Sequence, residues 1–63
     1  MPVITIDLGT LANREIKAEL VQAVTKAASS ATRIPEEKFT VLINELDRDN
    51  IGVGGRLLSD IKK

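Results

Sequence analysis

The chain is short and electrically balanced: it has 63 residues, of which nine are Lys or Arg and nine are Asp or Glu. Because it contains no Cys and no His, disulfides, thiolate or imidazole metal sites and histidine catalysis are excluded. The charges are scattered and Phe39 is the single aromatic residue, which argues against nucleic-acid binding through a basic patch or a base-stacking surface. The apolar runs are far too short to cross a membrane.

The size of the chain bounds its organisation. Residues 1–63 are expected to form one small domain, and a domain of this length buries only about 60% of the surface of its unfolded chain. With 43% apolar residues the chain can fold, but without disulfides we expect it to gain stability from oligomerisation. No signal peptide precedes the first patterned segment, so the expected location is the cytoplasm.

Two strands are predicted from alternating side chains. In residues 3–8, the apolar residues Ile4, Ile6 and Leu8 fall on one face, and the β-branched content is typical of a strand. Residues 39–46 alternate in the same way and predict a second strand.

A long amphipathic helix is predicted between them, over residues 14–32. Asn13 is a suitable N-cap, and Pro35 follows the end because proline disfavours helix in the residue before it. Lys17 is expected on the outer side. The face expected to point inward contains Ile16, Leu20, Ala23, Val24, Ala27, Ala28 and Ala31.

Shorter elements complete the chain. Residues 35–37 are predicted to form a helical turn, residues 47–50 a turn, and the glycine-rich residues 51–55 a short hairpin or bend. A final helical turn is predicted over residues 56–63, with Leu57, Leu58 and Ile61 facing inward.

The predicted order is therefore β-α-β, an α+β fold with a parallel strand pair joined by a right-handed crossover. Two strands under one helix leave a sheet edge and a sheet face open. We expect two such units to join into a four-stranded sheet with two helices on one face.

Position two holds the sharpest chemical feature. Removal of Met1, which a small second residue normally permits, would leave Pro2 with a free secondary amine. The pKa of an α-amino group is about 7.7–8.0, and burial lowers it further, so such an amine can act as a general base near neutral pH. Many chains begin with Met-Pro for other reasons, so the dipeptide alone does not predict catalysis.

Two other motifs are incomplete. The segment from Asp47 resembles the start of a calcium loop, but Ile51 stands at its fifth position and Leu58 at its twelfth, where a bidentate Glu is needed. Gly52 to Gly55 lack the spacing of a phosphate-binding loop, so we interpret these glycines as residues that bend the chain.

The chain resembles the 4-oxalocrotonate tautomerase family over essentially its whole length. This resemblance implies a homohexamer built as a trimer of dimers, with neither a metal nor an organic cofactor. It also implies that Pro2 is the catalytic base and acid in keto–enol isomerisation of a small enol or dienol keto acid. The residues that carry it are Pro2-Val-Ile-Thr-Ile, the helix from Asn13, Pro35, Val41-Leu-Ile-Asn-Glu45 and Asn50-Ile-Gly-Val-Gly-Gly55.

The substrate-binding positions depart from that family. Where its studied members have two arginines, this chain has Ala12 and Thr40, and neither can supply a bidentate cation. We expect Thr40 to donate a hydrogen bond to substrate, and Arg14 to replace the missing cation in preference to the arginines that flank the glycine bend. Ile51 matches an aromatic position that lines the apolar part of the family's pocket.

Three functions remain open from the sequence. The first is a Pro2-dependent tautomerase, an isomerase of a small keto acid. The second is a Pro2-dependent hydratase or dehalogenase acting on a small unsaturated acid. The third is a non-catalytic oligomeric scaffold of the same fold, which the missing arginines favour and a free amine of low pKa at Pro2 would oppose.

Overall fold

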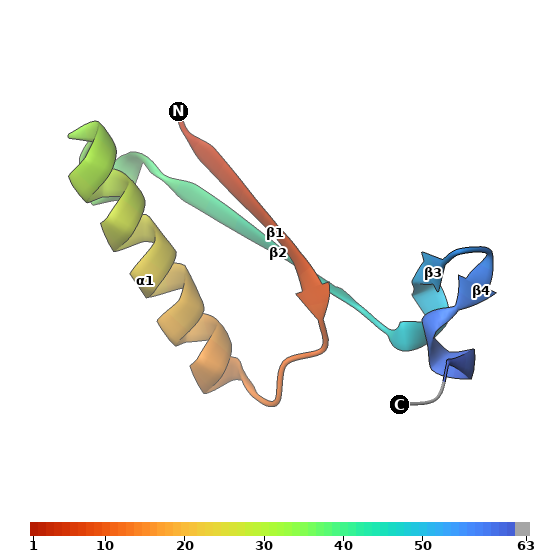
Figure 1. The fold of residues 1–63 in the computed structure, drawn as a ribbon. Coiled ribbons are helices and arrows are strands. Elements are labelled where there is room, and N and C mark those ends of the chain that lie inside the picture. Colours follow the sequence, from red (N-terminus) through yellow and green to blue (C-terminus); the bar gives the residue numbers. More distant parts are fainter. Residues whose placement is uncertain (62–63) are drawn as a thin grey trace.

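The computed structural model describes residues 1–61, and its element order follows the predicted β-α-β pattern (Figure 1). Among these residues, no helix combines the length and apolar character that a membrane span needs. The regular elements are β1 (Val3–Gly9), α1 (Arg14–Thr32), β2 (Thr40–Leu46), β3 (Gly52–Val53) and β4 (Arg56–Leu57), with 3₁₀ turns at Glu36–Lys38, Arg48–Asn50 and Leu58–Asp60.

Strands β1 and β2 form a parallel pair whose register runs from Val3↔Thr40 to Gly9↔Leu46. Helix α1 connects them and lies along one face of the pair (Figure 1). Side chains on that face are half-buried, including Ile4 and Ile6 of β1, whereas the alternate residues are exposed. The predicted fold class, with its parallel strand pair and glycine-rich hairpin, is confirmed.

Both ends of α1 follow from local chemistry. The Asn13 side chain accepts a hydrogen bond from the Ile16 backbone N–H at 2.9 Å, which satisfies one of the free donors of the first turn. At the other end, Arg33 adopts a left-handed conformation with φ 66° and donates its N–H to the Ser29 carbonyl. The predicted N-cap and helix limits are confirmed.

The predicted inward face of α1 is partly wrong. The half-buried apolar residues of the helix are Leu20, Val21, Val24 and Ala28, whereas Ile16 and three alanines on the flank of the helix stay exposed, namely Ala23, Ala27 and Ala31. The physical reason is that the apolar arc of the helix is wider than two strands can cover. Only the part of the arc that lies directly over β1 and β2 is shielded.

The end of the chain also differs from its prediction. Arg56 and Leu57 do not begin a helix but form β4, which pairs antiparallel with β3. Gly54 and Gly55 adopt φ of 62° and 84°, the two successive positive values that a tight hairpin turn requires. Leu57 is exposed rather than inward, only Leu58–Asp60 form a helical turn, and the last two predicted residues lie outside the described part.

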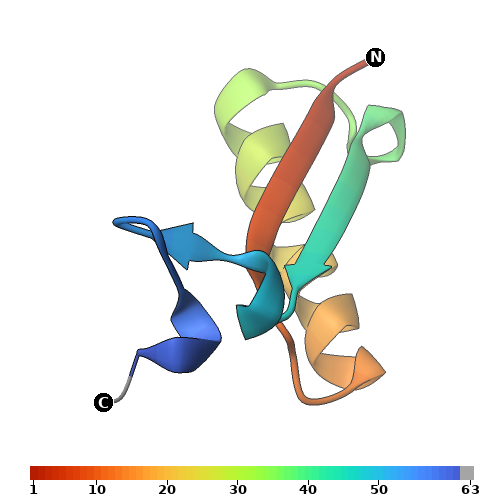
Figure 2. The same cartoon turned by 90° about the vertical axis from the view of Figure 1, so that its right-hand side faces the viewer.

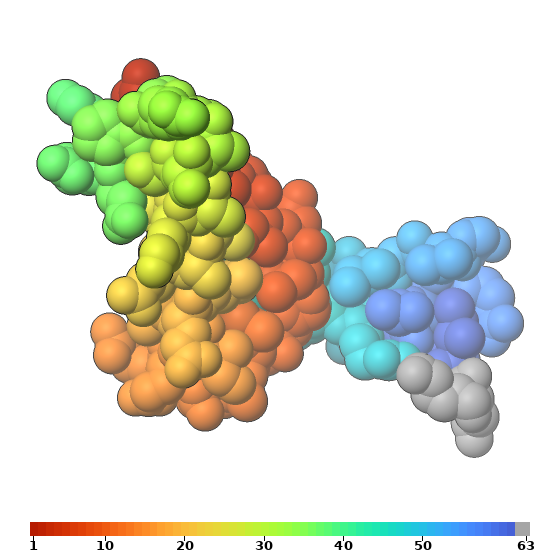
Figure 3. Space-filling model, turned by 60° about the vertical axis from the view of Figure 1, so that its left-hand side comes forward, coloured from red at the N-terminus to blue at the C-terminus, as the bar shows by residue number. Residues whose placement is uncertain are grey.

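The single chain has no core of its own. None of the described residues is fully buried. The hairpin with its flanking turns, residues 48–61, projects from the body formed by α1, β1 and β2 (Figures 1 and 3). The radius of gyration is 15.0 Å, against about 11 Å for a compact chain of this length. The accessible surface is 4999 Å², where about 4,000 Å² is typical of a monomer of this mass.

Candidate active site

Pro2 and Thr40 lie side by side at one end of the strand pair. The Thr40 backbone N–H donates to the Pro2 carbonyl at 3.0 Å, which extends the ladder one residue beyond β1. The Thr40 hydroxyl lies 3.8 Å from the sulfur of Met1, which is the residue attached to the Pro2 nitrogen. The parallel register therefore brings a hydroxyl donor to the place that Met1 occupies.

Met1 itself controls the chemistry of this end. While it is attached, the Pro2 nitrogen is an amide whose lone pair is delocalised into the carbonyl, so it cannot accept a proton near neutral pH. Met1 is 92% exposed and Pro2 is half-buried, which leaves the bond between them open to an aminopeptidase. Cleavage would create a secondary amine at the start of a hydrogen-bonded strand.

The other two predicted site residues lie elsewhere. Arg14 begins α1, and Ile51 follows the turn after β2, so both are at the end of the strand pair opposite to Pro2 (Figures 1 and 2). Strand β1 has seven residues, which span about 23 Å. Within one chain, the structure therefore brings Pro2 and Thr40 together but leaves Arg14 and Ile51 remote from them.

Ile51 lines a hollow of about 560 Å³ at this opposite end. It lies between the ends of β1 and β2 and the projecting residues 48–61, and both charged and apolar groups reach it. Its lining includes Thr10, Leu46, Asp47, Arg48 and Leu58. A hollow of this kind can hold a side chain or a small molecule; the carboxylates of Asp47 and Asp49 line it, whereas Pro2 does not.

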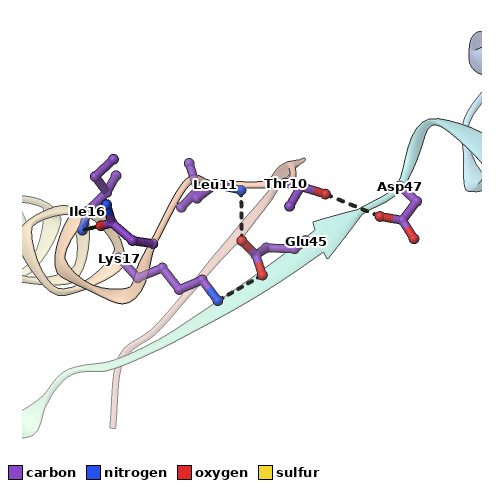
Figure 4. Close-up of polar contacts among 7 residues, drawn as sticks. Thr10, Leu11, Ile16, Lys17, Glu45 and Asp47 are labelled. Atoms are coloured by element: carbon purple, nitrogen blue, oxygen red, sulfur yellow. Dashed lines mark hydrogen bonds and ion pairs between the residues drawn. The ribbon is translucent and has the colours of Figure 1, made fainter.

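A carboxylate holds the loop between β1 and α1 next to this hollow (Figure 4). Glu45 accepts a hydrogen bond from the Leu11 backbone N–H at 2.8 Å and forms an ion pair of 2.8 Å with Lys17. A second contact joins Thr10 to Asp47 at 3.2 Å. The Lys17 hydrogen bond, followed by that of Leu11, lowers the pKa of Glu45 below its ordinary value of 4.5.

This cluster corrects the predicted position of Lys17, which is half-buried against β2 rather than on the outer side of the helix. No local signal in the sequence indicates the pair, because most of α1 and of β2 lies between its members. Within residues 1–61, the acidic side chains form no group that could hold a metal ion.

The two arginines that flank the glycine bend serve the projecting segment. Arg48 donates to the Leu58 carbonyl at 3.3 Å and Arg56 to the Asp60 carbonyl at 3.4 Å. Both guanidinium groups thus brace residues 48–61 internally, as expected for structural rather than substrate-binding charges.

Comparison with known proteins agrees with the fold and with the resemblance in the sequence. The family model described as tautomerase enzyme matches residues 2–61. A 2-hydroxymuconate tautomerase from Bacillus subtilis is 37% identical over 62 residues, which cover 98% of this chain and 100% of the relative.

Solved structures give the same result. A homologue of 4-oxalocrotonate tautomerase superimposes with a TM-score of 0.89 at 36% identity, over 97% of this chain and 100% of that one. A chain of the heterohexamer 4-oxalocrotonate tautomerase from Chloroflexus aurantiacus J-10-fl has a TM-score of 0.86 at 27% identity, over 98% and 100% of the two chains. The fold and the length agree with these proteins, and the alignments cover nearly the whole chain. The chain therefore belongs to the tautomerase family and is an isomerase.

Proposed function

We propose that this protein is a keto–enol tautomerase of a small enol or keto acid, with Pro2 as its general base and acid after Met1 is removed. The observation that carries this proposal is the position of Pro2. Pro2 directly precedes β1, and its carbonyl accepts a hydrogen bond from the Thr40 N–H. The Thr40 hydroxyl contacts Met1, the residue whose removal would free the Pro2 nitrogen. The name of the Bacillus subtilis relative supports a dienol acid as the class of substrate.

The proposed reaction needs one nitrogen and no external oxidant or reductant. The Pro2 amine accepts the proton of the enol hydroxyl while the C–O bond becomes a carbonyl. The resulting ammonium then returns a proton to carbon, so the amine is regenerated. The Thr40 hydroxyl is suited to donate a hydrogen bond to the oxygen on which negative charge develops.

We propose further that the active site forms between copies of the chain in a homohexamer. The extended shape, the absence of a buried core in residues 1–61 and the heterohexamer among its structural neighbours support this assembly. In such an assembly, the end of one chain that contains Arg14 and Ile51 could approach Pro2 of another. This arrangement would reunite residues that lie at opposite ends of the strand pair in a single chain, where β1 alone spans about 23 Å.

The test is ketonisation of an arylenolpyruvate by protein whose intact mass establishes that Met1 is absent. General acid–base catalysis contributes about 10²–10⁴-fold, so Pro2→Ala should lower kcat/KM by about 100-fold or more. Because Pro2→Ala still leaves a primary amine, the sharper control is protein that retains Met1, which should be inactive. Equal rates for wild type, Pro2→Ala and buffer would exclude the tautomerase and favour the non-catalytic scaffold.

A further inference from the structure

We propose that Lys38 binds the carboxylate of the substrate at Pro2. This inference rests on the proposed tautomerase and adds to it the group that recognises the acid. Lys38 ends the 3₁₀ turn between α1 and β2, and it was not among the residues predicted for the site.

The register of the strand pair brings the turn that contains Lys38 to the end of the pair where Pro2 lies. Val3 is paired with Thr40, and the bond from the Thr40 N–H to the Pro2 carbonyl continues that alignment. Lys38 precedes Thr40 by two residues, in the 3₁₀ turn that leads into β2. Figure 2 shows this turn at the same end of the strand pair as the amino terminus. The Lys38 backbone therefore lies at the end of the molecule where Met1 would be removed.

The backbone around Lys38 is well held. Its N–H donates to the Pro35 carbonyl at 3.0 Å, and the next N–H, of Phe39, donates to the Glu36 carbonyl at 3.0 Å. The contact of the Thr40 hydroxyl with the Met1 sulfur shows that a side chain from this part of the chain reaches the side chain of Met1. The lysine side chain, with four methylene groups, is longer than that of threonine and reaches further.

The distribution of charged side chains also supports Lys38 as the residue that binds the carboxylate. Among the described residues, the recorded ion pair is that of Lys17 with Glu45, and the guanidinium groups of Arg48 and Arg56 bond to carbonyls of the projecting segment. The ammonium of Lys38 is thus available to a ligand. Glu36 and Glu37 share its turn, but with about three residues per turn their side chains leave the axis in other directions. Arg33, at the helix end, adds positive charge to this end of the molecule.

The donor set defines the ligand. One ammonium and one hydroxyl, from Lys38 and Thr40, can satisfy one carboxylate and an adjacent carbonyl oxygen. A second carboxylate would require a further cation, which Arg14 could supply only from another copy of the chain.

The experiment compares phenylenolpyruvate with the enol of its methyl ester, using Met1-free protein. Lys38→Met should raise KM for the acid by about tenfold or more, as expected for loss of a hydrogen bond to a charged group, and leave kcat/KM for the ester within about twofold. Lys38→Arg, which keeps the charge, should recover most of the loss. Lys26→Met, which removes an exposed charge in the middle of α1, is the matched control and should behave as wild type.

Two results would overturn the proposal: an unchanged KM for the acid in Lys38→Met, or an equal loss for acid and ester. Binding of the unreactive acid 3-phenylpropanoate, followed by NMR titration, separates this inference from the proposed catalysis. Binding that weakens in Lys38→Met and persists in Pro2→Ala supports the carboxylate site even if no Pro2-dependent turnover is found. Binding that is absent, or equal in wild type and Lys38→Met, refutes it.

Discussion

Leu42 gives the most direct test of whether the open sheet face is covered by other copies of the chain. It lies on β2, on the face of the strand pair away from α1, and half of its surface (50%) is exposed. Full burial of a leucine side chain contributes about 1.5–3 kcal/mol, so covering the exposed half contributes about 1 kcal/mol for each chain. Val3 lies exposed on the same face at a position diagonal to Leu42, and the residues paired with them, Thr40 and Thr5, are polar.

Three substitutions of Leu42 should form a graded series in sedimentation velocity and thermal melting, measured over a wide range of protein concentration. Leu42→Ile keeps the volume and should assemble as wild type. Leu42→Ala should weaken each contact by about 1 kcal/mol, or about five- to tenfold in the association constant. Leu42→Glu buries a carboxylate at a cost of several kcal/mol and should dissociate into smaller, less stable species.

The refuting result is equally specific. If Leu42→Glu sediments at the same mass as wild type and melts at the same temperature, this face is not an interface. The excess accessible surface of the single chain would then need another explanation.

Two further predictions concern stability within the chain. Asn13→Ala removes the acceptor of the Ile16 N–H and should cost about 1 kcal/mol, or about 4–8 °C in Tm, whereas Asn13→Asp should retain the cap; equal melting of the two variants would contradict the capping role. The pKa of Glu45 is lowered by Lys17 and Leu11, so the folded chain binds fewer protons than the unfolded chain near pH 4.5. Its stabilisation should be complete above that pH and be lost as pH falls through the folded pKa. Urea midpoints should therefore decline toward acid less steeply in Glu45→Gln, and parallel curves would exclude the carboxylate as a source of that decline.

The sequence predicted those features that depend on neighbouring residues. Alternation predicted β1 and β2, and the limits of α1 follow from an N-cap side chain and a proline that both act within one turn. The same reasoning failed at residues 56–57, where the pattern was compatible with a helix. There, two glycines with positive φ form a tight turn, so that β4 pairs with β3 instead of forming the helix that the apolar periodicity favoured.

The candidate site was predicted only in part, because its residues come from different segments. The proposed chemistry of Pro2 depends on a free amine and not on the fold, so it could be proposed from the sequence alone. Arg14 and Ile51 lie far from Pro2 in one chain because of the length of β1 and the direction in which β2 runs, and neither residue's position can be read from its neighbours in the sequence. Lys38, which we propose as the carboxylate-binding residue, has no local signal in the sequence, because only the pairing of β1 with β2 brings its turn to the Pro2 end of the strand pair.

By itself, the sequence determined the β-α-β order, the helix with its N-cap and the family to which the chain belongs, and it suggested the proposed role of an amino-terminal proline. The tertiary structure decided which apolar residues are covered, the partnership of Lys17 with Glu45, and the neighbours of Pro2. The physical reason is the range of the interactions. Capping and periodicity act over a few residues, whereas the contacts of Glu45 and Thr40 join segments separated by nearly the whole helix, and their geometry exists only once β1 and β2 have paired.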